Sequence, residues 1–190
     1  MIAKAKSKHQ DPEDCSRKYY GKFRGAVVNN VDPKGLGRLQ VIVSEVMAAP
    51  LASWAMMCTP VGGIQHGMFS VPPINAGVWI EFEQGDIDYP IWTGCFLGTG
   101  LDAPKQAPAA NPVFQSITLQ TPSQNSVIID DAPGKGGVTI KIRTGAKITV
   151  TDKGIELDNG FGASISMIGP TIQIKGKLVS INGTNLTILE

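Results

Sequence analysis

The sequence predicts an all-β protein with two parts, a small N-terminal barrel and a C-terminal repeat of short strands. Along most of residues 19–190, apolar and polar residues alternate with the period of two that is typical of half-buried strands. No segment of residues 19–98 shows a convincing apolar period of 3.6 residues. A stretch rich in Pro, Ala and Gly, residues 99–114, is predicted to be a linker that separates the two parts.

Residues 1–18 are polar and without periodicity, and we expect them to form a flexible N-terminal arm. Residues 1–24 hold seven Lys and Arg against three acidic residues, whereas residues 25–98 hold two against six. A basic arm therefore precedes an acidic domain. That domain is a poor match for a surface that binds phosphate groups.

Cysteine usage and hydropathy indicate a protein made in a reducing compartment. Cys15, Cys58 and Cys95 are odd in number and form no CxxC motif, so neither a disulfide framework nor a zinc site is predicted. No apolar segment follows the N-terminal lysines, and no apolar run is long enough for a membrane span. We therefore expect the protein to be made and assembled in the cytoplasm.

Residues 19–98 are predicted to form the barrel. Strands are expected within residues 19–31, 38–46, 52–59, 67–71, 78–83 and 91–97. Asp32, Pro33 and Gly35 stand in turn positions between the first two strands, where Pro fixes φ and Gly supplies a left-handed step. Five or six short antiparallel strands in a domain of this size fit a Greek-key barrel such as an OB-fold.

The GDIDYP turn at residues 85–90 raises the question of a catalytic carboxylate pair. Glu81 and Glu83 lie on the polar face of the preceding strand, and Asp86 and Asp88 lie in the turn. Paired carboxylates would suit a cell-wall hydrolase, which is one alternative function. Nothing aromatic or polar marks a cleft around them, and Asp in a turn with Gly is ordinarily a turn former. We therefore predict a structural turn and no catalytic residues.

Nucleic-acid binding is the second alternative, because OB-folds stack bases on aromatic side chains within a basic groove. The candidate aromatic residues are Trp54, Trp79, Tyr89 and Trp92. With two basic residues against six acidic ones in residues 25–98, counterion release would supply little affinity. We therefore expect no nucleic-acid partner. His9 and His66 are the only histidines and have no evident partner, so neither a metal site nor a cofactor is predicted.

From residue 115 to residue 190 the chain is an imperfect internal repeat of short alternating segments. Steps of seven to ten residues separate equivalent positions. One face collects Val138, Ile140, Ile142, Ile148, Val150, Ile155, Leu157, Ile165, Ile172, Ile174, Val179, Ile181, Leu186 and Ile188. One such ribbon leaves its edges and its apolar face exposed, and Phe161 is the only aromatic residue after Phe114. Association of several chains is therefore predicted, although the pattern does not give their number.

The residues of the first part resemble a known family. The segment "GKFRGAVVNNVDPKGLGRLQVIV", the strand "SWAMMCTPVGG" and the stretch from Pro73 to Gly94 are similar to the OB-fold domain of the phage baseplate assembly protein V and VgrG spike family. The hairpin pattern of that family matches Asp32, Gly35, Gly37, Arg38 and Val41. The positions that we assign to the structural signature of the barrel are Gly37, Arg38, Gly85, Asp86, Asp88 and Pro90.

The resemblance implies a homotrimeric central spike of a contractile injection machine, in which an intertwined trimeric β-helix, or β-prism, follows the OB-fold. The spike would pierce the target envelope when the sheath contracts, with transient membrane contact and no enzymatic activity. A separate hub protein would bind above the OB-fold, since only a short arm precedes it. The residues expected around the axis of the trimer are Val138, Ile140, Ile142, Ile148, Ile155, Ile165, Ile172, Ile174 and Ile181.

The C-terminal end is expected to carry a separate tip protein, as PAAR-repeat proteins cap similar spikes. No histidine follows His66, so the His-x-His metal site that seals some phage spikes is missing from this sequence. Apolar residues alternate almost to the end of the chain, which predicts a blunt, unpaired plateau. The expected contacts of the tip protein are Asn182, Gly183, Thr184, Leu186, Ile188, Leu189 and Glu190.

Overall fold

The computed structural model of the chain describes residues 17–46, 53–106, 114–181 and 186–189. Apart from two short 3₁₀ helices, the regular elements of these residues are β-strands, so the predicted all-β class is confirmed. The chain divides into two compact units, Met1–Gly98 and Thr99–Glu190. Within the described ranges, no helix is long and apolar enough to cross a membrane.

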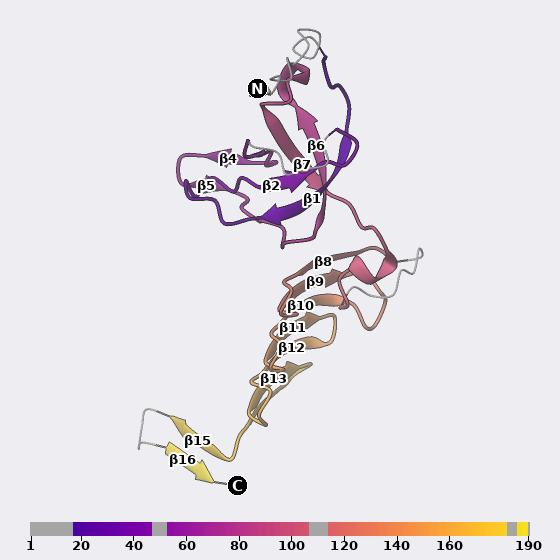
Figure 1. Cartoon of the computed structure of the whole chain (residues 1–190). Coiled ribbons are helices and arrows are strands. Elements are labelled where there is room, and N and C mark those ends of the chain that lie inside the picture. The colour runs from indigo at the N-terminus through magenta and orange to yellow at the C-terminus, as the bar shows by residue number, and fades with distance from the viewer. Residues whose placement is uncertain (1–16, 47–52, 107–113, 182–185, 190) are drawn as a thin grey trace, which may run out of the picture. The chain divides into compact units, whose positions relative to one another are not determined.

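The first unit contains a small barrel (Figure 1). Its strands are β1 (Phe23–Asn29), β2 (Gln40–Ile42), β3 (Met56–Met57), β4 (Gly62–Gly63), β5 (His66–Gly67), β6 (Gly77–Phe82) and β7 (Pro90–Cys95). Five of them form a sheet in the order β2-β1-β6-β7-β3, in which only β3 and β7 run parallel. An antiparallel bridge between Leu39 and Ala55 joins the two ends of this sheet and closes the barrel.

The interior of the barrel is an apolar core of its own. Along β6 the side chains of Val78, Ile80 and Phe82 are buried while those between them are partly exposed, as the alternation predicts. The core consists of Val27, Leu39, Val41, Val43, Ala55, Val78, Ile80, Phe82 and Trp92, each at most 6% exposed. The Trp92 indole also donates a hydrogen bond of 3.0 Å to the Gly37 carbonyl oxygen.

The expected strand at residues 67–71 is much shorter in the structure. Only His66–Gly67 pairs, as β5, with the equally short β4. Met68 and Phe69 are 59% and 67% exposed and pair with no strand among the described residues. Two consecutive prolines follow at 72 and 73, and proline has no N–H to donate to a ladder. The segment therefore forms a loop after its first two residues.

The second unit is built around a meander of seven short strands, which follow one another as a ladder in Figure 1. They are β8 (Ser116–Gln120), β9 (Ser126–Asp130), β10 (Gly137–Lys141), β11 (Lys147–Thr151), β12 (Gly154–Asp158), β13 (Ser164–Ile168) and β14 (Thr171–Lys175). Every strand is antiparallel to the one before it. The interior strands β9–β13 therefore pair within one chain, and interleaved chains are not needed to satisfy them.

A short segment before the meander is ordered against it, although its composition is that of a linker. The 3₁₀ helix η3 (Gly100–Asp102) begins with a capping box in which the Thr99 and Asp102 side chains bond to each other's backbone N–H. Gln106 then bonds to the β8–β9 end of the sheet. Its side chain donates to the Gln124 carbonyl oxygen at 2.7 Å and accepts a hydrogen bond from the Ser126 hydroxyl at 2.9 Å.

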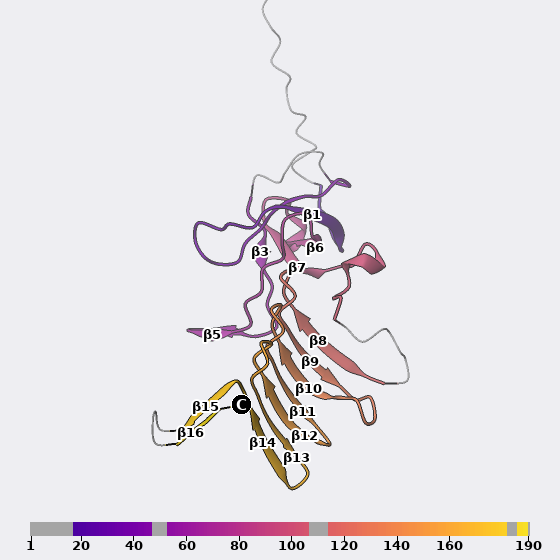
Figure 2. The same cartoon turned by 90° about the horizontal axis from the view of Figure 1, so that it is seen from below.

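The last two strands form a separate hairpin. Strand β15 (Leu178–Ile181) pairs only with β16 (Leu186–Leu189) among the described strands. Figure 2, a view from below, shows this hairpin leaving the ladder after β14.

Candidate assembly interface

Two rows of apolar side chains run across one face of the seven-stranded sheet. Directly opposed residues on antiparallel strands lie on the same face, as do residues two apart along a strand. The first row is Leu119, Val127, Ile140, Ile148, Leu157, Ile165 and Ile174. The second row is Ile117, Ile129, Val138, Val150, Ile155, Met167 and Ile172. We call the fourteen residues of these rows the apolar face.

The apolar face is exposed in the single chain. Ile155 is 37% exposed at its centre, and Leu119 and Ile172 are 64% and 69% exposed near its ends. Contiguous apolar surface of this extent is rare on a monomer, and it marks a site of association. Within the described part of the chain, the sheet therefore presents an apolar surface that its own strands leave exposed.

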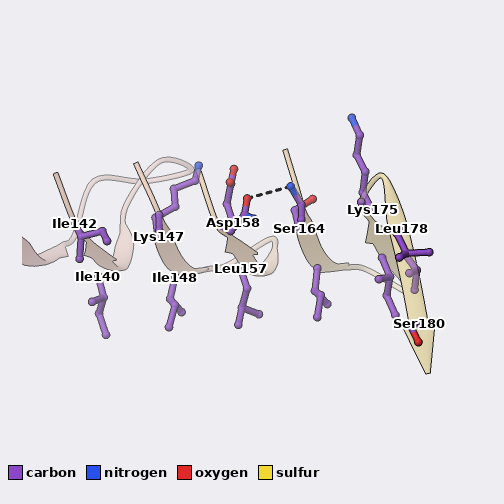
Figure 3. A pocket seen from close by; sticks show the side chains of 17 residues that line it. Ile140, Ile142, Lys147, Ile148, Leu157, Asp158, Ser164, Lys175, Leu178 and Ser180 are labelled. Carbon is purple, nitrogen blue, oxygen red and sulfur yellow. Dashed lines mark hydrogen bonds between the residues drawn. The ribbon is translucent and has the colours of Figure 1, made fainter. Parts of the chain in front are cut away.

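The opposite face of the sheet is mostly polar. Figure 3 shows Ile148 and Leu157 pointing to one side of their strands and Lys147 and Asp158 pointing to the other. Its central row is Thr118, Ile128, Thr139, Thr149, Glu156, Ser166 and Gln173, in which only Ile128 is apolar. Gln106, from the segment before the sheet, bonds to Gln120 and Ser126, which belong to this polar face.

The residues predicted around the trimer axis fall mostly on this face. Seven of the nine belong to the two rows: Val138, Ile140, Ile148, Ile155, Ile165, Ile172 and Ile174. Ile142 follows the end of β10 and lies in a turn, and Ile181 is the last residue of β15. Val150 and Leu157 were in the longer list of one face, and the residues of the apolar face missing from both lists are Ile117, Leu119, Val127, Ile129 and Met167. The alternation in "SITLQ" was the signal that would have found Ile117 and Leu119.

Three five-residue turns stack along one margin of the sheet. Each is closed by a bond from the N–H of its first residue to the carbonyl of its last: Thr121 to Asn125, Ile142 to Ala146 and Asn159 to Ala163, at 2.9, 3.0 and 3.1 Å. A Cβ atom on Gly160 would come within 2.9 Å of the backbone of the preceding turn. Gly160 has a φ of +76°, so both its conformation and its neighbours require glycine. Stacking of these turns thus fixes the spacing between successive hairpins of the sheet.

In the barrel, the signature residues Gly37 and Arg38 belong to a bonded turn. Arg38 pairs with Asp32 at 2.6 Å, and these two side chains are only 13% and 3% exposed. The Asp32 carboxylate also accepts backbone N–H bonds from Lys34, Leu36 and Arg38. The Arg38 guanidinium and these N–H groups hold the pKa of Asp32 well below its usual range. Arg38 further lies over the Trp54 ring, 5.3 Å from its centroid. This ion pair was not anticipated from the sequence.

The turn at residues 85–90 is held by its own backbone. The Asp86 side chain accepts a bond from the Asp88 N–H, and the Asp86 N–H donates to the Glu83 carbonyl oxygen. Residues Glu83–Gly85 form the 3₁₀ helix η2, and Pro90, the first residue of β7, is fully buried. Gly85 has a φ of +76° and its carbonyl accepts the N–H of Tyr19. This geometry is that of a turn former.

Two of the four acidic residues near this turn have their side chains engaged in separate interactions. Glu81 bonds to Lys22 at 2.5 Å, and Asp86 bonds within the turn. In the described part of the chain, no three His, Cys, Asp or Glu residues gather in a way that could hold a metal ion. Cys58 and Cys95 are both free and exposed.

The four aromatic residues considered for base stacking do not occupy equivalent positions. Trp92 is in the core, 5% exposed, and Trp54 lies under Arg38. Trp79 packs on Phe96 with ring centroids 5.1 Å apart, and Tyr89 is 62% exposed in the turn. The four rings thus have different environments in the barrel. The excess of acidic over basic residues in residues 25–98 also remains unfavourable for binding nucleic acid.

The predicted tip-protein residues lie at the end of the chain. Leu186, Ile188 and Leu189 belong to β16. Asn182, Gly183, Thr184 and Glu190 lie outside the described residues, as does the N-terminal arm up to residue 16.

Both units match family models. A model described as "Type VI secretion system/phage-baseplate injector OB domain" matches residues 23–97. A model described as "Phage baseplate V C-terminal trimerisation domain" matches residues 116–187. A comparison with curated proteins gives no match. The matched ranges cover the barrel, the whole meander and most of the C-terminal hairpin.

Proposed function

Because the chain is a baseplate spike protein of the phage baseplate V family, with its injector OB domain and its C-terminal trimerisation domain, we propose that it is the needle of a contractile injection machine. In this proposal three copies form a central spike, which sheath contraction drives through the envelope of the target cell. The function is mechanical and needs no catalytic residue.

The observation that carries this proposal is the apolar face in a trimerisation domain. Each chain supplies a sheet with one polar and one apolar side, and among the described residues no second sheet packs on the apolar side. Three such sheets around a common axis form a prism in which the apolar rows face inward and the polar sides face water. The prism has a dry core and no bare face.

The direction of the strands suits a shaft that carries load. Neighbouring strands in a sheet lie about 4.7 Å apart, so the nine strands β8–β16, stacked along the axis, would give a shaft on the order of 40 Å. That length is comparable to one bilayer with its headgroups, which is about 40–45 Å thick. Backbone hydrogen bonds run along such an axis, where a compressive load would act.

The position of the chain in the particle tests this proposal. An antibody against the chain, followed by electron microscopy of assembled particles, should label the distal centre of the baseplate. Light scattering of the purified protein should give three chains per particle. Label on the sheath or at the baseplate periphery, or a monomeric chain at micromolar concentration, would overturn the proposal.

We further propose a separate hub protein above the OB domain and a separate tip protein at the C-terminal end. The basic balance of residues 1–24 supports the N-terminal arm as a contact with the hub, and the apolar alternation of the last strand supports a cap. Co-purification of the tip protein should be lost when the chain is truncated after Ser180. A truncated trimer that keeps the tip protein would show that it binds elsewhere.

A further inference from the structure

Among the described strands, none pairs with the outer edge of β14. Strand β14 pairs with β13 on one side only, and the next strand, β15, pairs only with β16 among the strands described. An unpaired edge exposes a row of backbone N–H and C=O groups that accept another strand. The chain therefore reaches a free edge and then supplies, two residues later, a hairpin that does not occupy it.

The sequence of the hairpin nevertheless continues the register of the meander. Continuation of the two apolar rows would place Ile174 opposite Val179 and Ile172 opposite Ile181 if β15 paired with a β14 edge. The observed β15–β16 register then places Ile188 and Leu186 next in the same two rows. The apolar residues of the hairpin thus continue the two rows of the apolar face, although the hairpin does not pair with the sheet.

The β14–β15 connection also differs from the other turns on the same margin of the sheet. The three preceding turns there have five residues and stack on one another, whereas the β14–β15 connection has two. The regular stepping of the ladder therefore ends at β14.

The detached hairpin leans over the apolar side of the sheet. A hollow of about 610 Å³ separates them, lined by Ile148, Leu157 and Ile165 of the sheet and by Leu178 and Val179 of β15. Figure 3 shows Ile148, Leu157 and Leu178 among the side chains that line this space. One chain leaves the space empty, so a second molecule has room between the hairpin and the sheet.

We propose that the β15–β16 hairpin of each copy pairs along the β14 edge of the next copy, so that the three chains exchange their tips. This inference rests on the proposed trimeric spike. The occupant is a second copy of this chain because the trimerisation match, residues 116–187, runs through both the sheet and the hairpin. A threefold exchange is closed: each copy gives one hairpin and receives one, and no β14 edge is left over.

With this exchange, the shaft would have one part in which strands pair within a chain and another in which they pair between chains. Along β8–β14 each chain forms its own sheet, and the chains are held together by apolar contact. Beyond β14 the backbone of one chain is bonded to another. The C-terminal end of the spike, where the tip protein is proposed to bind, is thus held together by hydrogen bonds between chains.

Cysteine pairs test the exchange in the full-length chain, with Cys15, Cys58 and Cys95 replaced by Ser. In the proposed register Gln173 of β14 lies opposite Ser180 of β15, and both are at polar-face positions. Opposed residues of antiparallel strands have Cα atoms about 4.5–5.5 Å apart, which a disulfide can span. The variant Gln173→Cys/Ser180→Cys is oxidised as a trimer and run on a denaturing gel without reductant.

Covalent dimers and trimers support the exchange. A monomer band with an internal disulfide shows that the hairpin returns to its own sheet, and no disulfide shows that the strands do not pair in this register; either result overturns the proposal. The matched control is Ser166→Cys/Gln173→Cys, whose positions are opposed within one chain and should give a monomer band. Light scattering of the variant before oxidation distinguishes failure of the hairpin exchange from failure of the trimeric spike. A monomer at that stage would refute the trimer, whereas a trimer that then forms only internal disulfides would refute the exchange alone.

Discussion

The barrel and the meander are built from the same alternating strands but bury their apolar residues in different places. In the barrel nine hydrophobic side chains are at most 6% exposed. Among the described side chains after residue 98, no hydrophobic one is buried, and Ser126 is the only buried polar residue. Strand alternation therefore indicates which face becomes buried, but not whether the same chain or another one buries it.

Closure explains the difference. The barrel brings the first and last strands of its sheet together through the Leu39–Ala55 bridge, and its interior is shielded on all sides. The meander adds each strand beside the previous one and never returns to its beginning. Its inner face must therefore be covered by other copies.

The two regions can be followed separately in solution. The three tryptophans, Trp54, Trp79 and Trp92, all lie in the barrel. Tryptophan fluorescence therefore reports on the barrel alone, while light scattering reports on association of the meander.

The largest expected effect comes from a charge on the apolar face. Ile140→Asp places three carboxylates around the proposed axis, at a cost on the order of 10 kcal/mol per trimer if each uncompensated group costs about 3 kcal/mol. Light scattering should show monomers, while the tryptophan fluorescence of the barrel stays native. The control is Lys141→Asp, one residue away on the polar face, which should remain trimeric. Equal effects of the two changes would refute the assigned faces.

The next effect is on the backbone of the meander. Gly154 has a φ of +152°, and a Cβ atom there would overlap the Met167 carbonyl oxygen. Gly154→Ala should destabilise the trimer by about 3 kcal/mol per copy, at the upper end of backbone strain. Gly169→Ala is the control, because Gly169 also has a positive φ, +55°, but nothing within 4 Å. It should cost about 1 kcal/mol. Thermal unfolding followed by circular dichroism measures both; equal losses would contradict the overlap.

A smaller effect, confined to the barrel, is expected at Asp32. Its pKa is depressed by Arg38 and by backbone N–H groups, so the carboxylate stabilises the folded barrel at neutral pH. This contribution is present above the ordinary carboxyl pKa of about 4 and is lost as the pH falls below it toward the depressed value. Asp32→Asn should lower the urea midpoint of tryptophan fluorescence at pH 7 and leave the number of chains unchanged. An unchanged midpoint would show that the ion pair contributes nothing to stability.

The smallest effect is expected at the surface pair of Lys22 and Glu81. Their side chains are 52% and 40% exposed, and exposed ion pairs contribute about 0.2–1 kcal/mol. Lys22→Met should therefore change the stability of the barrel by less than about 1 kcal/mol and leave the trimer intact. A larger loss in urea unfolding would mean that the pair is more than a solvated contact.

Much of this comparison was accessible from the sequence, because it depends on alternation and on turn residues. Val78, Ile80 and Phe82 identified the buried side of β6, and the repeat after residue 115 identified a sheet with one apolar face. The apolar positions of β9 were missed because "VII" in this strand is continuous, so its faces cannot be told apart without the pairing.

Other features depend on contacts that no periodicity encodes. The Asp32–Arg38 pair requires the folded geometry of a turn, and Gln106 bonds to the sheet from a segment with the composition of a linker. The separation of β15 from β14 runs against the pattern, since the apolar register continues across Gly176–Lys177.

The meander also determines how such a shaft can change in evolution. Each strand of β8–β14 pairs only with the strands directly before and after it in the chain, so strand pairing does not fix the number of strands in the ladder. Duplicating or deleting one hairpin would change the length by two strands, about 9.4 Å, and would leave every other register unchanged. In the proposed spike, the length of the shaft would therefore change in whole hairpins and not in single strands.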